Sequence, residues 1–203
     1  MKVSDINKLR KAMEKELESK RYEHTLSVAY TAANLAMVYG EEVDKALTAG
    51  MLHDCAKCMS HSKQIAVCAK NHVQLSEAES VKNSPLIHAK AGSVVARTKY
   101  QITDEDILNA ICYHTTGRPN MSMLEKIVYI ADYIEPGRKH AENLPQIRRL
   151  AYQDLDAALC NILKDTLAYL SKKGGQVDPM TQKTYDCYVN QKTNNGENIQ
   201  DCK

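Results

Sequence analysis

Apolar residues recur along this chain at intervals of three and four far more often than at intervals of two. This spacing is typical of amphipathic helices and predicts an almost entirely helical protein. The expected helices span residues 5–19, 21–39, 43–56, 62–73, 85–100, 104–114, 123–134 and 145–172. Two of them carry N-terminal start signals, which are Ser84 before Pro85 and Thr103 three residues before Asp106.

The pattern changes after the last of these helices. Gly174 and Gly175 are expected to end it, and the final stretch QKTNNGENIQDCK is polar and poor in residues that could pack. We therefore predict a single all-α domain over residues 1–175, built as a helical bundle. Residues 176–203 are expected to form a polar, partly frayed C-terminal tail.

Several polar residues interrupt the apolar faces of the expected helices. His53 and Asp54 end a stripe formed by Leu47, Gly50 and Met51, and Asp132 interrupts the apolar run IVYIADYI. His24 shares its face with apolar positions in the same way. A buried carboxylate is costly unless it is paired or binds a metal.

Two interpretations fit these buried polar residues. A single buried histidine is more often a hydrogen-bonded core residue than a ligand, but four such residues in one chain favour a shared site. Imidazole nitrogens and carboxylate oxygens suit iron, manganese or zinc. The periodicity alone leaves a metal site in a core cleft and a structural role about equally open.

Composition narrows the classes of function. The chain has 203 residues, and its 27 Lys and Arg against 25 Asp and Glu give a net charge of +2. The overall electrostatic field of the protein therefore does not favour binding to nucleic acid or to an anionic membrane surface. The apolar runs are too short to span a bilayer, and the N-terminus lacks the features of a secretory signal, so we expect a cytoplasmic protein. Seven cysteines, including the CAKC of Cys55 and Cys58, are expected to be reduced thiols.

The residue blocks around these positions carry a more specific resemblance. The order of His24, His53 with Asp54, and Asp132 resembles the HD-domain metal-dependent phosphohydrolases. The successive stretches RYEHTLSVA, GMLHDCAK, SPLIHAKAGSVVA, AICYHTTGRPNMS and KIVYIADYIEPGR resemble the YqeK family of symmetrical bis(5'-nucleosyl)-tetraphosphatases. The similarity continues through IRRLAYQDLDAAL and thins out after Gly175.

This resemblance implies a fold, a metal centre and a reaction. The fold is an all-α HD domain, and the reaction is cleavage of diadenosine tetraphosphate into two ADP molecules. The implied cofactor is iron, as one or two ions, with manganese or cobalt as substitutes. The implied ligands are His24, His53, Asp54, His88, His114 and Asp132, with Asp54 placed to bridge two ions.

Cationic and polar residues near these ligands are candidates for substrate binding. Lys57 follows His53 by one helical turn, Arg21 precedes His24, and Arg118 and Arg138 lie four and six residues beyond a proposed ligand. Guanidinium groups bind phosphate oxygens in pairs, although each of these residues taken alone is more often a solvated surface charge. The stretch His114, Thr115, Thr116, Gly117 and Arg118 reads as a loop that could line a phosphate path.

The expected catalytic residues are Asp54, Lys57 and His88. Tyr113, Tyr129 and Tyr133 are candidates for stacking on a base, because the chain has no Phe or Trp.

Alternative functions stay open at this point. They are an HD-type nucleotidase or another nucleotide phosphohydrolase, and a regulatory module that binds a nucleotide without hydrolysing it. The expected partner is a small dinucleoside polyphosphate or nucleotide. The apolar face of the expected helix over 145–172 is explained by core packing, although it also allows a homodimer.

Overall fold

The structure is a computed structural model that describes residues 5–139, 143–174 and 177–194. All regular secondary structure in these ranges is α-helical, which confirms the predicted all-α class. The helices in chain order are α1 (Ile6–Glu16), α2 (Ser19–Tyr39), α3 (Val43–Leu52), α4 (His61–Lys70), α5 (Glu77–Ser80), α6 (Ile87–Thr98), α7 (Glu105–Tyr113), α8 (Met123–Ile134), α9 (Leu144–Leu150), α10 (Leu155–Lys172) and α11 (Pro179–Asn194).

Each of the eight expected helices has a counterpart, but the last one is divided. Helices α9 and α10 occupy its range and are separated at residues 151–154, where Asp154 caps α10 by accepting a hydrogen bond from the backbone N–H of Ala157 at 2.8 Å. The short helix α5 was not predicted. It has a capping box in which Ser76 and Glu79 each accept a hydrogen bond from the other's backbone N–H.

Two predicted start signals were wrong. Helix α7 begins after Asp104, whose carboxylate accepts hydrogen bonds from the backbone N–H groups of Asp106 and Ile107, so Thr103 is not the cap. Helix α6 begins at Ile87, two residues later than expected. Ser84 instead accepts the backbone N–H of Leu86 before the helix starts.

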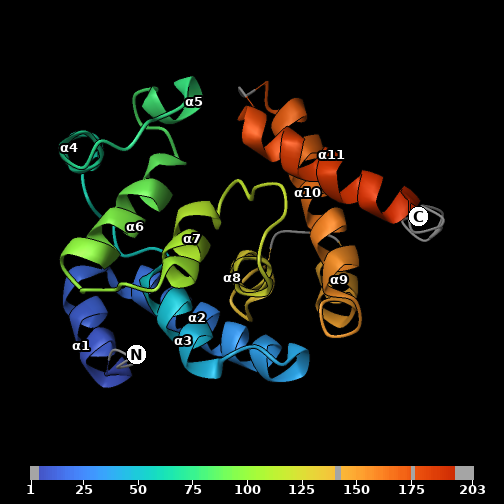
Figure 1. Cartoon of the computed structure of the whole chain (residues 1–203), viewed down its shortest axis with the longest axis horizontal. Helices are drawn as coiled ribbons and strands as arrows, with labels where there is room; N and C mark the ends of the chain where they lie inside the picture. Colours follow the sequence, from blue (N-terminus) through green and yellow to red (C-terminus); the bar gives the residue numbers. More distant parts are fainter. Residues whose placement is uncertain (1–4, 140–142, 175–176, 195–203) are drawn as a thin grey trace.

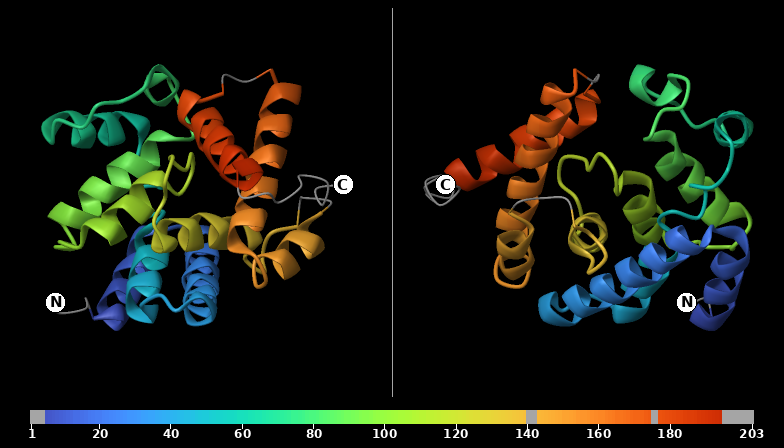
Figure 2. Two further views of the ribbon diagram at one scale, coloured as in Figure 1. Left: turned by 45° about the vertical axis from the view of Figure 1, so that its right-hand side comes forward. Right: turned by 180° about the vertical axis from the view of Figure 1, so that it is seen from behind.

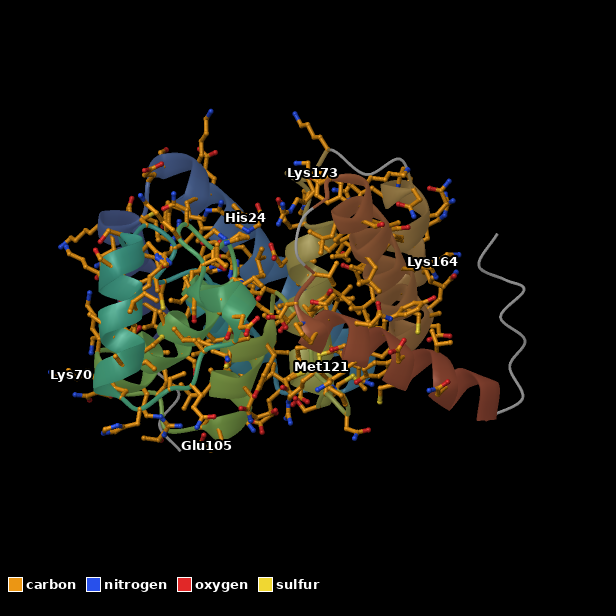
Figure 3. All side chains as sticks on the ribbon, turned by 90° about the horizontal axis from the view of Figure 1, so that it is seen from above. His24, Lys70, Glu105, Met121, Lys164 and Lys173 are labelled. Carbon is orange, nitrogen blue, oxygen red and sulfur yellow. The ribbon has the colours of Figure 1, made fainter. Side chains whose placement is uncertain are left out.

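Helix α8 lies in the middle of the molecule and contacts α2, α3, α7, α9 and α10 (Figure 1). Ser122 and Glu125 form a capping box at its start. Its buried side chains lie on nearly all sides, as expected for a helix surrounded by others. The labelled Lys70 on α4 and Lys164 on α10 mark opposite sides of the molecule (Figure 3).

Helices α2 and α3 pack closely because their contact residues are small. A Cβ atom added at Gly50 would lie 2.7 Å from Cα of Ala29, a distance that real Cβ atoms do not show. The absent side chain therefore allows the two backbones to approach, and the end of α3, which His53 and Asp54 directly follow, is held against α2.

Helix α11 lies within the segment expected to be a polar tail. It packs against α10 (Figure 2), and its buried Tyr188 accepts a hydrogen bond from the backbone N–H of Met121 at 2.9 Å. Thr184, also fully buried, contacts the loop at Thr116. A few inward side chains thus anchor a helix whose composition is mostly polar, while residues 195–203 lie outside the described residues.

None of the helices in the described ranges combines the length and the apolar character that crossing a membrane requires.

We expect Gly50→Ala to destabilise the fold. Its new methyl group meets the backbone of α2, which cannot move away as a flexible side chain could, so the free energy of unfolding should fall by about 1 to 3 kcal/mol. Urea unfolding of chelator-treated protein measures this change.

Gly92→Ala is the matched control, because a Cβ atom there meets its nearest neighbours at 3.4 Å or more. Alanine also favours a helix over glycine by roughly 1 kcal/mol, so the stability of this variant should be unchanged or slightly higher. Equal losses in both variants would contradict a specific close approach at Gly50.

Candidate metal centre

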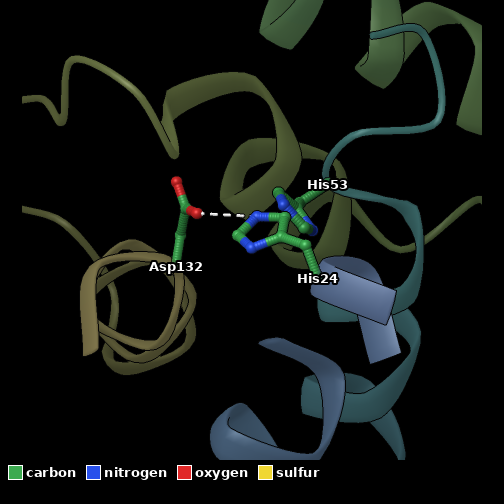
Figure 4. A group of neighbouring side chains, drawn as sticks. All are labelled: His24, His53 and Asp132. Atoms are coloured by element: carbon green, nitrogen blue, oxygen red, sulfur yellow. Dashed lines mark ion pairs between the residues drawn. The ribbon is translucent and has the colours of Figure 1, made fainter. Parts of the chain in front are cut away.

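Five helices bring the proposed ligands together. His24 comes from α2, His88 from α6 and Asp132 from α8, while His53, Asp54 and His114 lie directly after α3 and α7. Nε2 of His24 lies 3.0 Å from Oδ1 of Asp132, and the ring of His53 packs edge-on against that of His24 (Figure 4). His24, His53 and Asp132 each offer a ligand atom within 4.8 Å of the others.

Asp54 lies between two pairs of histidines and turns one oxygen toward each pair. Its Oδ2 is 3.4 Å from Nε2 of His53 and 3.9 Å from Nε2 of His24. Its Oδ1 is 3.1 Å from Nε2 of His88 and 3.7 Å from Nε2 of His114. The carboxylate of Asp54 is therefore shared between the two histidine pairs.

Backbone carbonyls fix the orientation of two of the imidazoles. Nδ1 of His53 donates to the carbonyl of Gly50, and Nδ1 of His114 donates to that of Ile111, each at 2.7 Å. With the proton on Nδ1, Nε2 of each ring lies in the cluster as an acceptor, and Nε2 of His114 is 3.1 Å from Nε2 of His88. This is the tautomer that binds metals.

Atoms left without partners show that the residues fit a divalent metal. Among the described residues, Nε2 of His24, Nε2 of His53 and Oδ1 of Asp54 are buried and make no hydrogen bond of acceptable geometry, although other cluster atoms lie 3.0 to 3.9 Å away. Unpaired buried nitrogen and carboxylate atoms are costly unless a cation binds them.

The protonation states also suit ligands. Burial alone would raise the pKa of Asp54, but its contacts with His53, His114 and His88 hold that pKa well below its usual range. Burial similarly opposes ionisation of Asp132, while His24, His53 and Arg138 lower its pKa. Burial lowers the pKa of His88 to about 4, so its ring is neutral near pH 7.

A cavity of about 760 Å³ opens beside the cluster. Lys57, His88, His114, Thr115, Asp132 and Arg138 form its wall at the metal centre. The rest of its lining includes Tyr129 and Tyr133 of α8, Asn143 and Leu144, and Ile162, Asp165, Thr166, Ala168, Tyr169 and Lys172 of α10. Its size is that of a typical small-molecule site.

Three of the predicted cations lie at the centre. Nη1 of Arg21 donates to Oδ2 of Asp54 at 2.8 Å, and Nη2 of Arg138 donates to Oδ1 of Asp132 at 2.7 Å. Nζ of Lys57 is 3.2 Å from both ring nitrogens of His88. Burial lowers the pKa of this lysine.

Other predicted residues lie elsewhere. Arg118 forms two hydrogen bonds with Glu125, at 2.7 and 2.9 Å, and its guanidinium lies over the ring of Tyr113. Thr116 is buried, and its carbonyl accepts the hydroxyl of Thr184 on α11. These residues are absent from the cavity wall.

Gly117 has a structural reason to be glycine. Its φ of +64° lies in the left-handed region, and a Cβ atom there would meet Cγ2 of Thr184 at 2.7 Å.

Comparison with known proteins assigns the fold to a family. The HD-domain family profile matches residues 21–137, a range that contains all six proposed ligands. The chain is 40% identical to the symmetrical bis(5'-nucleosyl)-tetraphosphatase of Bacillus subtilis, over 87% of this chain and 94% of that protein. The chain belongs to this family of HD-domain hydrolases.

Two further relatives support this membership. The symmetrical bis(5'-nucleosyl)-tetraphosphatase of Halalkalibacterium halodurans is 39% identical over 84% of this chain and 89% of its own. A crystal structure from Clostridium acetobutylicum, titled as a predicted HD superfamily hydrolase involved in NAD metabolism, is 41% identical. It superposes with a TM-score of 0.87 and covers 91% of this chain and 97% of its own.

Sequence reasoning missed several residues around this HD-domain site. Oε1 of the buried Glu135 lies 3.1 Å from Nδ1 of His24, and the sequence predicts core packing or a homodimer face for α10 but not its part in the cavity lining. A signal for Glu135 existed, since it is an acid within the block ADYIEPGR only three residues after Asp132. No comparable signal marks Asp165 or Thr166, because a polar residue on a long helix is ordinarily solvated.

We expect purified protein to carry about one to two equivalents of a divalent transition metal, and Asp54→Asn to lose most of it, because the amide removes the charge that both histidine pairs share. Elemental analysis of protein prepared without chelators measures the metal, and circular dichroism checks that the helices remain.

The matched control is Asp44→Asn, the same change at an exposed position in the first turn of α3. It should keep the wild-type metal content. Equal metal content in Asp54→Asn and wild type would make Asp54 a structural acid.

Proposed function

We propose that this protein hydrolyses diadenosine tetraphosphate symmetrically into two ADP molecules, using a metal centre held by His24, His53, Asp54, His88, His114 and Asp132. The observation that carries this proposal is the position of Asp54, with one oxygen toward each histidine pair, beside a cavity whose wall includes Lys57 and Arg138. The names of the relatives agree with this substrate.

We propose iron as the resident metal, with manganese or cobalt as substitutes, since imidazole and carboxylate ligands suit all three. A divalent metal at such a site lowers the pKa of bound water and neutralises charge on phosphoryl oxygens. The protein's own residues then have to bind and orient the polyphosphate chain.

The cations at the centre are suited to that task. In the structure Arg21 and Arg138 each neutralise a carboxylate that we assign as a metal ligand. With a cation held by those carboxylates, both guanidinium groups would be available to phosphate oxygens, which they bind in pairs. Lys57 adds a third positive charge beside His88.

The cavity lining offers groups that could bind a nucleoside of the substrate. Tyr129 and Tyr133 offer aromatic surface, while Asn143 and Asp165, joined by a hydrogen bond of 2.6 Å, offer polar groups in the same wall. Hydrolysis adds one water molecule across the bond between the second and third phosphates, so each product keeps two phosphates. The expected cytoplasmic location and the possible homodimer stay predictions.

We expect diadenosine tetraphosphate to give ADP as its only nucleotide product. Incubation of metal-loaded protein with a nucleotide panel, followed by chromatography, measures this. The panel should include mononucleotides, a guanosine polyphosphate and NAD, because the Clostridium relative is named for NAD metabolism. Equal amounts of AMP and ATP would mean an asymmetric cut, and turnover of mononucleotides alone would favour a nucleotidase.

We expect Arg138→Ala to lower kcat/KM for diadenosine tetraphosphate by about ten- to a hundred-fold, the equivalent of one charge-assisted hydrogen bond to phosphate. Metal content measured in parallel separates this effect from a loss of Asp132 as a ligand. Arg97→Ala is the matched control, because Arg97 also pairs with a carboxylate but is exposed on α6. A similar loss in both variants would contradict a phosphate contact at Arg138.

A further inference from the structure

The histidines of the metal centre differ in what faces the ring nitrogen on the side away from Asp54. In His53 and His114 this nitrogen donates to a backbone carbonyl. In His24 it faces the carboxylate of Glu135, 3.1 Å away. His88 differs from all three, because a cation lies beside its ring: Nζ of Lys57 is 3.2 Å from Nδ1 and 3.2 Å from Nε2.

Glu135 is fixed in place by its surroundings. It is 3% exposed, and its Oε2 accepts the backbone N–H of Gly137 at 2.5 Å. A Cβ atom at Gly137 would lie 2.9 Å from the same oxygen, so only glycine leaves the carboxylate in this position. Arg148 also donates to the backbone carbonyls of Ile134 and Glu135, which fixes the end of α8.

These contacts make the two sides of Asp54 unequal in charge. The first half-site, which consists of His24, His53 and Asp132, has two carboxylates besides Asp54, namely Asp132 itself and Glu135 behind His24. The second half-site, His88 and His114, has Lys57 beside it. Arg21 and Arg138 offset part of the negative charge in the first half-site, but both are partly exposed and therefore screened by water.

We propose that Glu135 is a positioning residue that makes the first half-site bind its ion more tightly than the second. A carboxylate behind a ligating imidazole holds the ring in one orientation, fixes the proton on the far nitrogen and strengthens the near nitrogen as a donor. The cation beside His88 has the opposite effect on the second half-site. The inference rests on the metal centre of the proposed function and is independent of the substrate.

The test is a titration of chelator-treated protein with Co²⁺, with bound metal counted by equilibrium dialysis and elemental analysis. Wild type should bind in two steps of different affinity. Glu135→Gln should weaken the tight step by about 10- to 100-fold and leave the weak step in place. Gly137→Ala, which displaces the carboxylate without removing its charge, should shift the tight step in the same direction.

Ligand and control variants assign the steps. His24→Ala should remove the tight step and His88→Ala the weak one. Glu105→Gln, the same change at an exposed ion pair, should move neither. If wild type binds only one Co²⁺, that ion should respond to Glu135→Gln and not to His88→Ala.

Several outcomes would overturn the proposal. An unmoved tight step in Glu135→Gln, equal weakening of both steps, or loss of the tight step in His88→Ala would each contradict it while leaving the metal centre intact. Wild-type protein that binds no Co²⁺ would instead overturn the metal centre, and the role of Glu135 with it.

Discussion

The charge of Asp54 is the constraint on which the rest of the structure depends. A carboxylate that is almost fully buried at the end of α3 is tolerated only where positive or hydrogen-bonding groups surround it, and here they come from α2, α6 and the residue after α7. Helices α2 and α6 must therefore begin, and α7 must end, at defined positions beside the end of α3. The small residues that let α2 and α3 approach serve the same requirement, because they bring Arg21 and His24 within reach of the carboxylate.

Much of the fold could be predicted from the sequence because apolar spacing records which side of a helix is buried. Such spacing identified the helices around Val28, Leu52 and Ile130, whose side chains are fully buried in one core. It did not show the break between α9 and α10, since Asp154 resembles any other acid on a polar face until its carboxylate is seen to cap a backbone N–H. It also missed α11, where three buried side chains, Thr181, Thr184 and Tyr188, outweigh a polar composition.

For the candidate site, the sequence predicted the proposed ligand positions but not the contacts between distant residues. Polar residues within apolar runs, together with the family resemblance, identified six positions that the structure brings into one cluster. Spacing could not show that Arg118 pairs with Glu125, because that contact depends on where the loop after α7 meets the start of α8. Nor could it show that α10 forms a cavity wall, since periodicity tells which residues face inward but not which distant residues they meet.

The lining of the cavity comes from different parts of the chain. The six proposed metal-ligand positions precede residue 137, where the HD-domain match ends, whereas much of the remaining cavity lining comes from residues 143–172. The proposed ligands and much of the remaining cavity lining thus lie in consecutive stretches of the sequence. Exchange of the C-terminal third between relatives is therefore a route by which one hydrolytic centre could come to accept different nucleotide substrates. A protein engineer could use the same junction to build chimeras.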